Sequence, residues 1–403
     1  MKPKIKVLMA FYSPIIKPGG KSERLQGYLK KFDQTNEFEV HFVGLPDEKD
    51  LALKSYRALK SYTDSKIALQ IEKIFSRVGN YIGLNGLGRY LAINILSYKG
   101  ARENTFHNVD IVFAHPGFRS LIKKAKSLSI PVVIEASDSH PQYLLDIDKK
   151  RRSFYGQKSN RFIMRKAVKR NIDSYRLADK IIVFGTHAQQ TFIENGIQNE
   201  KLQILYPPLE KKMQPYSFVS KNPDFTCVAT HTIRKGTDLV LYAWEEYKNN
   251  GGSGELNVIG KPCNDFWHIY KKLSCKDSIS LLGHVDTVDY FKQKFTVLMF
   301  PSYAEGRPRL ILEAVGAGCC CVVSREATAD IIVHGYNGYI VKKTSSSITY
   351  TMHTIDSEWM NEVMQLSNNA KRTTEKTNYY MEVTQILNGI IEKRFLKEKM
   401  VTN

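Results

Sequence analysis

Two carboxylates stand eight positions apart near the end of the chain. Glu305 opens a loop that contains glycine and proline, and Glu313 lies in the helix that we expect after this loop. The apolar run 296–300 before the loop predicts a buried strand. A loop that leads into a helix presents free backbone N–H groups and the positive end of the helix dipole, which favour a phosphate. Carboxylates favour sugar hydroxyls, so the stretch indicates a nucleotide-sugar site; the alternative is a pair of solvated glutamates at a helix end.

Short apolar strands alternate with helix-length segments twice along the chain. In the first half we expect strands at 4–11, 39–43, 111–114, 132–135 and 181–184. In the second half we expect them at 225–229, 256–259, 279–282, 297–300, 320–323 and 339–341. This alternation predicts an α/β fold with two Rossmann-like domains whose sheets are parallel and covered on both faces. The break falls near the consecutive prolines Pro207 and Pro208, and ligands are expected in the cleft between the domains.

Length and composition agree with two globular domains. The chain has 403 residues, of which 42% are hydrophobic and 25% charged, as in a soluble protein. The first apolar run, 7–16, contains Pro14 and lacks a small-residue cleavage site, so a buried strand is a better interpretation than a signal peptide. No stretch of about 20 residues is apolar enough to span a bilayer. We therefore expect a cytoplasmic protein, and peripheral contact with a membrane surface is compatible with this expectation.

The six cysteines all lie in the second half of the chain. They show neither a Cys-x-x-Cys pair nor a histidine at metal-ligand spacing. Three of them are consecutive, at 319–321, and in a strand they would point to alternate faces. We interpret them as small apolar core residues in a reducing compartment.

The sequence from Glu305 to Ala314, Glu-Gly-Arg-Pro-Arg-Leu-Ile-Leu-Glu-Ala, resembles a known signature. It is similar to the Glu-(seven residues)-Glu motif of retaining glycosyltransferases of the GT-B fold, in the form found in glycosyltransferase family 4. Four further segments resemble that family in the same order, namely 17–20, 178–182, 234–236 and 330–338. The resemblance implies GT-B architecture, with two Rossmann-like domains that face a central cleft and a C-terminal helix that returns to the N-terminal domain. It assigns 1–206 to an acceptor-binding domain, 207–373 to a nucleotide-sugar domain and 374–403 to a helical tail.

The resemblance also implies roles around the two glutamates. Glu313 would accept hydrogen bonds from the ribose hydroxyls, and Glu305 would lie near the ring hydroxyls of the donor sugar. The backbone N–H groups of Gly306, Arg309 and Leu310 would face the phosphate and the sugar.

Glycines and neighbouring backbone groups are expected to complete the nucleotide site. Groups near Gly260 and Val285 would recognise the base. In the first domain, Gly19 and Gly20 would let the backbone approach the phosphates or the acceptor.

The departing diphosphate needs positive charge, because negative charge grows on it as the glycosidic bond breaks. Lys235 and Arg234, directly before Gly236, resemble the family's phosphate-binding turn. The family normally has a second basic residue six positions before the lysine, where this chain has Ala229. Arg234, Arg307 and Arg309 are the candidates to replace it.

Three residues of the first domain are candidates for contact with the sugar or the acceptor. The family often has a histidine just after the strand that here ends at Glu135, but this chain has Ser137 at that position. Asp138 and His140 follow closely, and His115 ends another strand. A plain loop role is the alternative for each of the three.

The segment Asp146-Ile147-Asp148 mimics the metal-binding Asp-x-Asp of another glycosyltransferase fold. It precedes four basic residues instead of closing a strand, so we predict no metal site here. The resemblance to GT-B enzymes, whose mechanism uses no bound metal, implies metal-independent activity. No cofactor is expected, since the UDP- or GDP-linked donor is a substrate.

Positive charge is concentrated in the first half. Residues 1–200 hold 34 Lys and Arg against 19 Asp and Glu, a net charge of +15, whereas the whole chain carries +19. Ten of these basic residues lie in 149–170, among aromatic and aliphatic side chains. This segment favours an anionic membrane surface; an acidic glycan and, less favoured, nucleic acid are other partners, and a solvated basic helix is the plainest interpretation.

The first functional hypothesis is a retaining, hexosyltransferase-like enzyme that moves a sugar from a nucleotide-diphosphate donor to a glycan or lipid-linked acceptor. A nucleotide-sugar epimerase of related fold is the second. A basic, non-enzymatic module derived from the GT-B fold is the third, and the residues at 229 and 137 are its best support.

Overall fold

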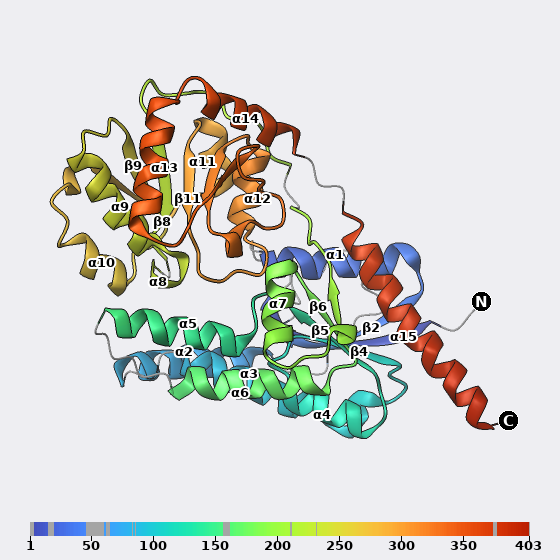
Figure 1. Cartoon of the computed structure of the whole chain (residues 1–403). Coiled ribbons are helices and arrows are strands. Elements are labelled where there is room, and N and C mark those ends of the chain that lie inside the picture. Colours follow the sequence, from blue (N-terminus) through green and yellow to red (C-terminus); the bar gives the residue numbers. More distant parts are fainter. Residues whose placement is uncertain are drawn as a thin grey trace.

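The computed structural model describes most of the chain as two lobes, each built on one parallel sheet (Figure 1). The described residues are 4–14, 20–45, 60–61, 65–82, 84, 86–155, 162–209, 212–230, 232–373 and 377–402.

The first domain contains a seven-stranded sheet in the order β3-β2-β1-β4-β5-β6-β7. Its strands are β1 (Ile5–Pro14), β2 (Phe38–Leu45), β3 (Lys60–Ser61), β4 (Ile111–Ala114), β5 (Val132–Ala136), β6 (Lys180–Val183) and β7 (Leu202–Ile204). Five of these are the predicted ones. The other two, β3 and β7, were not predicted; they lie at the two edges of the sheet and have two and three residues.

Helices cover both faces of this sheet. They are α1 (Gly20–Thr35), α2 (Ser65–Tyr81), α3 (Leu87–Gly100), α4 (Arg119–Ser127), α5 (Pro141–Phe154), α6 (Phe162–Leu177) and α7 (Thr186–Glu194). Alternate residues of β1 enter different cores, because successive side chains of a strand point to opposite faces. Val7 and Met9 pack with α1, whereas Leu8 and Ala10 pack in the cluster formed with α3, α4 and α7.

The second domain contains a six-stranded sheet in the order β10-β9-β8-β11-β12-β13. The strands are β8 (Asp224–Val228), β9 (Glu255–Ile259), β10 (Ile279–Gly283), β11 (Val297–Phe300), β12 (Cys320–Val323) and β13 (Gly338–Ile340). The helices are α8 (Thr232–Lys235), α9 (Thr237–Asn249), α10 (Asn264–Tyr270), α11 (Thr287–Gln293), α12 (Arg309–Gly316), α13 (Ser345–Ser357) and α14 (Glu362–Arg372). All six predicted strands are present. Cys319, directly before β12, and Cys320 and Cys321 within it are buried in this core. All six cysteines are free thiols.

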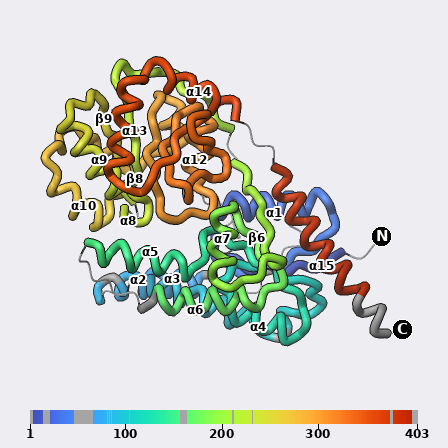
Figure 2. Tube along the Cα trace, in the orientation of Figure 1, coloured from blue at the N-terminus to red at the C-terminus, as the bar shows by residue number. Residues whose placement is uncertain are grey.

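The last helix, α15 (Tyr379–Thr402), leaves the second domain and lies against the first (Figures 1 and 2). Tyr379, Val383, Leu387 and Ile391 enter the core that also holds one face of α1. The spacing of these four residues is that of one helical face, so the helix packs by an amphipathic stripe. No helix within the described ranges is long and apolar enough to cross a membrane.

We expect Leu387→Ala to lower the free energy of unfolding of the first domain by about 2–5 kcal/mol, since it removes a fully buried side chain and leaves a cavity. Leu396→Ala, on the same helix but 58% exposed, is the matched control and should change stability by less than about 0.5 kcal/mol. Denaturant unfolding of both variants measures the difference. Equal losses would show that α15 does not pack as described.

Candidate functional site

A cavity of about 480 Å³ opens at the carboxyl ends of β8, β9 and β11. This is the edge at which open parallel sheets bind ligands, and the volume is in the range of small-molecule sites. Seven sequence-predicted residues line it: Lys235, Gly260, Val285, Glu305, Arg307, Arg309 and Leu310. The structure therefore brings most of the predicted donor-binding residues to one place.

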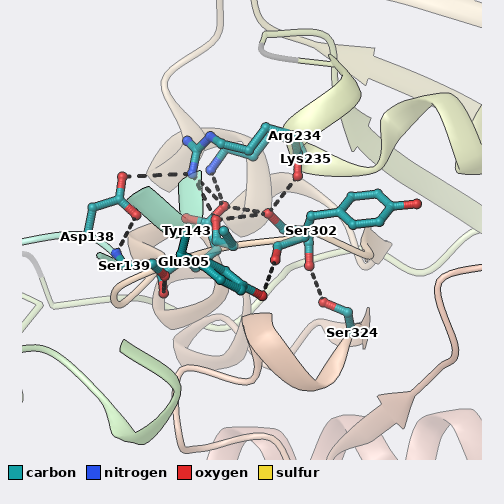
Figure 3. A network of polar contacts seen from close by, with 10 residues as sticks. Asp138, Ser139, Tyr143, Arg234, Lys235, Ser302, Glu305 and Ser324 are labelled. Atoms are coloured by element: carbon teal, nitrogen blue, oxygen red, sulfur yellow. Dashed lines mark hydrogen bonds and ion pairs between the residues drawn. The ribbon is translucent and has the colours of Figure 1, made fainter. Parts of the chain in front are cut away.

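Glu305 lies at the inner end of this cavity and is almost completely buried. Lys235 Nζ donates to Glu305 Oε1 at 2.6 Å, and Ser302 Oγ donates to the same oxygen at 2.7 Å (Figure 3). Burial by itself would raise the pKa of Glu305, but Lys235 and then Arg234 outweigh it and the pKa is lowered. The carboxylate of Glu305 is therefore held in its ionised form beside Lys235.

Gly236 explains how Lys235 comes so close to the loop after β11. Its φ is +71°, and an added Cβ would lie 2.2 Å from the carbonyl oxygen of Pro301. Only glycine accepts both the left-handed conformation and this approach. The contact is completed by Tyr303 N, which donates to Arg234 O at 2.9 Å.

Arg234 points along the domain interface and is absent from the cavity lining (Figure 3). Its Nη1 donates to Ala304 O at 2.8 Å and lies 3.5 Å from Glu305 Oε1 and 3.9 Å from Asp138 Oδ2. Asp138 belongs to the first domain. Burial raises the pKa of Asp138, although Arg234 acts in the opposite direction. Ser139 Oγ donates to Glu305 O at 2.9 Å, so the first-domain loop touches the glutamate loop directly.

Glu313, the second glutamate of the motif, is 3% exposed. Its Oε1 accepts from Arg309 Nε at 2.6 Å and its Oε2 accepts from Thr287 Oγ1. Arg309 Nη1 also donates to Glu23 of α1, which links the cavity of the second domain to the first domain. Helix α12 begins at Arg309, so the first backbone N–H groups of the helix, which include that of Leu310, lack intrahelical acceptors beside the cavity.

The position of the missing family arginine, Ala229, is completely buried in the second-domain core. Of the three candidates to replace it, Arg307 and Arg309 line the cavity. Arg307 Nη1 donates to Ala329 O at 2.7 Å, and its guanidinium lies 4.7 Å from the ring centroid of Tyr206. The cavity thus has the positive charges of Lys235, Arg307 and Arg309.

The structure does not place His140 in the cavity. The residue caps α5, its Nδ1 accepts from Gln142 N at 3.3 Å, and its ring packs edge-on against Phe192. Burial lowers the pKa of His140 to about 4. The side chain therefore positions the loop that carries Asp138, which favours the loop role for His140; a direct sugar contact stays an untested prediction.

The remaining first-domain candidates lie apart from the cavity. His115 directly follows the carboxyl end of β4 and is absent from the cavity lining. Gly20 begins α1, and Gly19 lies outside the described residues. Both aspartates of the Asp-x-Asp segment lie in α5, where Asp148 pairs with Arg152 one turn later.

Some residues of the site were missed in the sequence. Ser302 and Thr287 hold the two glutamates, and His284 lines the cavity next to Val285. The available signal was that Ser302 stands two positions after the β11 segment and three positions before Glu305. Glu23 carried no local signal, because its partner Arg309 is 286 residues away.

Residues 222–355 match the family model described as "Glycosyl transferases group 1". An uncharacterized glycosyltransferase of Haemophilus influenzae is 20% identical over 173 residues, which cover 41% of this chain. The chain spans about half the length of this curated relative, 48%.

Solved structures resemble nearly the whole chain. HepE from Anabaena, in complex with UDP-glucose, has a TM-score of 0.63 at 15% identity and covers 96% of this chain and 100% of its own. Sucrose-phosphate synthase from Thermosynechococcus elongatus has a TM-score of 0.64 at 11% identity, with 98% and 100% covered. The lipopolysaccharide outer core galactosyltransferase WaaB has a TM-score of 0.60 at 17% identity, with 97% and 100% covered.

These similarities confirm the predicted GT-B fold, while the narrower assignment to glycosyltransferase family 4 stays a prediction. The match lies in the domain that carries the cavity, both glutamates and Lys235. Residues 222–355 therefore resemble the glycosyl transferases group 1, and the chain as a whole has the GT-B fold of these solved structures.

Proposed function

We propose that the chain is a retaining glycosyltransferase that moves a sugar from a nucleotide-diphosphate donor to a glycan or lipid-linked acceptor. The observation that carries this proposal is the pair Lys235–Glu305 in a cavity that also receives the first turn of α12. Cations and free N–H groups favour a diphosphate, and buried carboxylates favour hydroxyls. The complex of HepE with UDP-glucose supports a UDP-linked donor. A GDP-linked donor is the alternative.

The residues suggest how the chain acts on such a donor. We assign Glu313 to the ribose because its two oxygens accept hydrogen bonds from Arg309 and Thr287, both of which line the cavity. Lys235, Arg307 and Arg309 face the diphosphate and stabilise the charge that grows on it. With these cations the diphosphate is held by protein groups, and we propose activity without metal or cofactor.

In the proposed reaction the bond between the anomeric carbon and the phosphate oxygen breaks, and a bond to the acceptor oxygen forms on the same face. The acceptor's proton goes to the departing phosphate. The acceptor enters from the side of Asp138, which lies across the interface from Glu305. Glu305 and Lys235 lie together on one side, unlike the paired acid and base that flank the bond in glycosidases.

Calorimetry with UDP and GDP tests this function, followed by donor hydrolysis without acceptor and by NMR of the product anomer. We expect binding of one nucleotide and hydrolysis that persists in EDTA. Absence of nucleotide binding at millimolar concentration would exclude the proposal. Interconversion of sugar epimers without transfer would support an epimerase instead.

Glu313→Ala should weaken nucleotide binding by about 1–3 kcal/mol, because it removes charged hydrogen bonds to the ribose and leaves Arg309 with one carboxylate partner fewer. Glu362→Ala is the matched control: this glutamate is exposed in the first turn of α14 and should leave the affinity unchanged. Calorimetric titration of both variants with the preferred nucleotide measures the difference. Equal affinities would remove the role of Glu313.

The basic segment 149–170 is partly used at the domain interface. Arg151 pairs with Asp238, and Arg152 pairs with Asp265, so these two cations face the second domain. Lys149 and Lys150 are exposed near Phe154, which is 74% exposed. We propose that this end of α5 contacts an anionic membrane surface, and co-sedimentation with anionic vesicles against neutral ones tests this.

A further inference from the structure

Three cations and a histidine gather at the carboxyl ends of β1 and β4, on the first-domain side of the cleft. We refer to Lys21, Arg89, His115 and Arg170 as the first-domain basic cluster. They come from four separate elements: the first turn of α1, the first turn of α3, the end of β4 and the middle of α6. None of them lines the cavity described above.

Packing contacts bring these side chains together. The backbone N–H of His115 donates to Ala10 O at 2.9 Å, which joins the ends of β4 and β1. A Cβ built on Gly117 would lie 3.5 Å from both Arg170 Nη2 and His115 Nδ1, so the two side chains meet over this glycine.

Helix α3 fixes the two arginines. Arg170 Nη1 donates to Asn94 Oδ1 at 3.1 Å, and its guanidinium lies 5.0 Å from the centroid of the Tyr90 ring. Arg89 lies on the same helix, with its guanidinium 5.6 Å from the centroid of the Tyr12 ring. The cluster is thus a built arrangement and not a set of loose surface chains.

The positive charges of the cluster act on one another. The pKa of His115 is lowered well below its usual value, first by loss of hydration and then by Lys21, Arg170 and Arg89. Lys21 is reached by solvent, yet enough protein and charge surround it to lower its pKa to about 8; reduced hydration is the main cause, followed by Arg89 and Arg24. The cations therefore repel one another.

Carboxylates offset this charge only in part: Glu135 and Asp138 raise the pKa of Lys21, but less than burial and the neighbouring arginines lower it. Neither Lys21 nor Arg89 makes an ion pair with a residue in the described part of the chain. Of the acidic groups nearby, Glu135 pairs with Arg24 at 2.9 Å and Glu72 accepts from Tyr12. Asp138 is shared with Arg234 across the interface. Incompletely compensated cations that are held in place favour an anionic ligand.

We propose that the first-domain basic cluster binds a phosphate or diphosphate group of the acceptor, an inference that rests on the proposed glycosyltransferase function. Three full positive charges match a dianion or a diphosphate better than a single carboxylate. Lys21 interacts electrostatically with Asp138, which stands 3.9 Å from Arg234 at the donor side. A phosphorylated acceptor bound at the cluster therefore places its sugar toward Asp138 and Glu305.

The test is a calorimetric titration with inorganic pyrophosphate in the presence of saturating UDP, which occupies the donor cavity. We expect one pyrophosphate to bind, and the double variant Lys21→Gln, Arg89→Gln to bind it at least tenfold more weakly. Both residues are exposed and make no ion pair with the described residues, so their replacement leaves the fold intact. Lys123→Gln, an exposed position on α4, is the matched control and should bind as the unaltered chain does.

The affinity for UDP distinguishes a failure of the proposed function from a failure of the acceptor site. The double variant should bind UDP within twofold of the unaltered chain, because neither residue lines the donor cavity. Failure to bind UDP at all would remove the proposed function, whereas UDP binding without pyrophosphate binding, or equal pyrophosphate binding in the double variant, would overturn the acceptor site alone.

Two further probes identify the source of the phosphate, again with UDP bound. Tighter binding of farnesyl diphosphate than of glucose 1-phosphate would indicate a lipid-linked acceptor, and the reverse would indicate a free sugar phosphate. Tighter binding of glucuronate than of either would contradict a phosphate site.

Discussion

Replacing Lys235 with alanine is expected to reduce turnover of the nucleotide sugar by about a hundredfold or more. Lys235 lines the cavity, and its ammonium group is one of three cations placed to stabilise the departing diphosphate. Loss of one preorganised electrostatic group at a reacting centre costs roughly a factor of 10²–10³ in rate. Steady-state kinetics of donor hydrolysis measure the loss, and Lys271→Ala, at an exposed position of the same domain, is the control.

Lys235 also neutralises Glu305, and this second role has to be separated from the first. Without Lys235 the buried carboxylate keeps Arg234, at 3.5 Å, as its one nearby cation among the residues that the structure describes, so its pKa should rise. In a Glu305→Gln background that cost disappears, since no buried charge is left. If Lys235→Ala then has no effect on turnover, the lysine serves only its neighbour and has no part in phosphate stabilisation.

Gly306→Ala is expected to lower kcat for the donor by at least about tenfold while UDP affinity changes much less. A Cβ at this position would lie 2.5 Å from the carbonyl oxygen of Ser137 and 3.0 Å from the Cα of Asp138. Both atoms are backbone atoms of the other domain, so they cannot rotate away and the domains must separate. A displacement of about 1 Å at a reacting centre costs up to a factor of 10² in rate, while the cavity proposed for the nucleotide lies within the second domain.

Steady-state kinetics and small-angle X-ray scattering measure the effect of Gly306→Ala. Gly389→Ala is the matched control, because nothing lies within 4 Å of its added Cβ and α15 should gain stability from the alanine. An unchanged kcat together with an unchanged radius of gyration would show that the two loops do not touch in solution.

The fold was predictable because its strands are short apolar runs between helical segments. All six strands of the second sheet and five of the seven in the first follow that pattern. Strands β3 and β7 do not, because two or three residues at a sheet edge need no continuous apolar run. They form by pairing with β2 and β6, and such pairing is a property of the assembled sheet.

The candidate site was predictable where one motif carries it along the chain. Glu305, Arg307, Arg309 and Leu310 reach the cavity together because the loop and the first turn of α12 hold them. The direction of single side chains was not predictable. Arg234 and Lys235 are adjacent, yet the lysine lines the cavity and the arginine reaches toward the other domain.

The direction of the His140 side chain was likewise not predictable from the sequence. Its sequence position after β5 suits a cleft residue, but Tyr175 and Phe192 offer an aromatic pocket that only the folded domain creates.

Arg309 has a consequence for the order in which ligands and domains act. One guanidinium group bonds both Glu313, at the proposed ribose site, and Glu23, on the opposite lobe. A ligand that strengthens or weakens the hydrogen bond between Arg309 and Glu313 also changes the hydrogen bond between Arg309 and Glu23, and with it the contact between the lobes. Thermodynamic linkage then requires the reciprocal effect: closure of the lobes alters nucleotide affinity by the same factor by which nucleotide alters closure. Donor binding and cleft closure are thus coupled through the guanidinium group of Arg309.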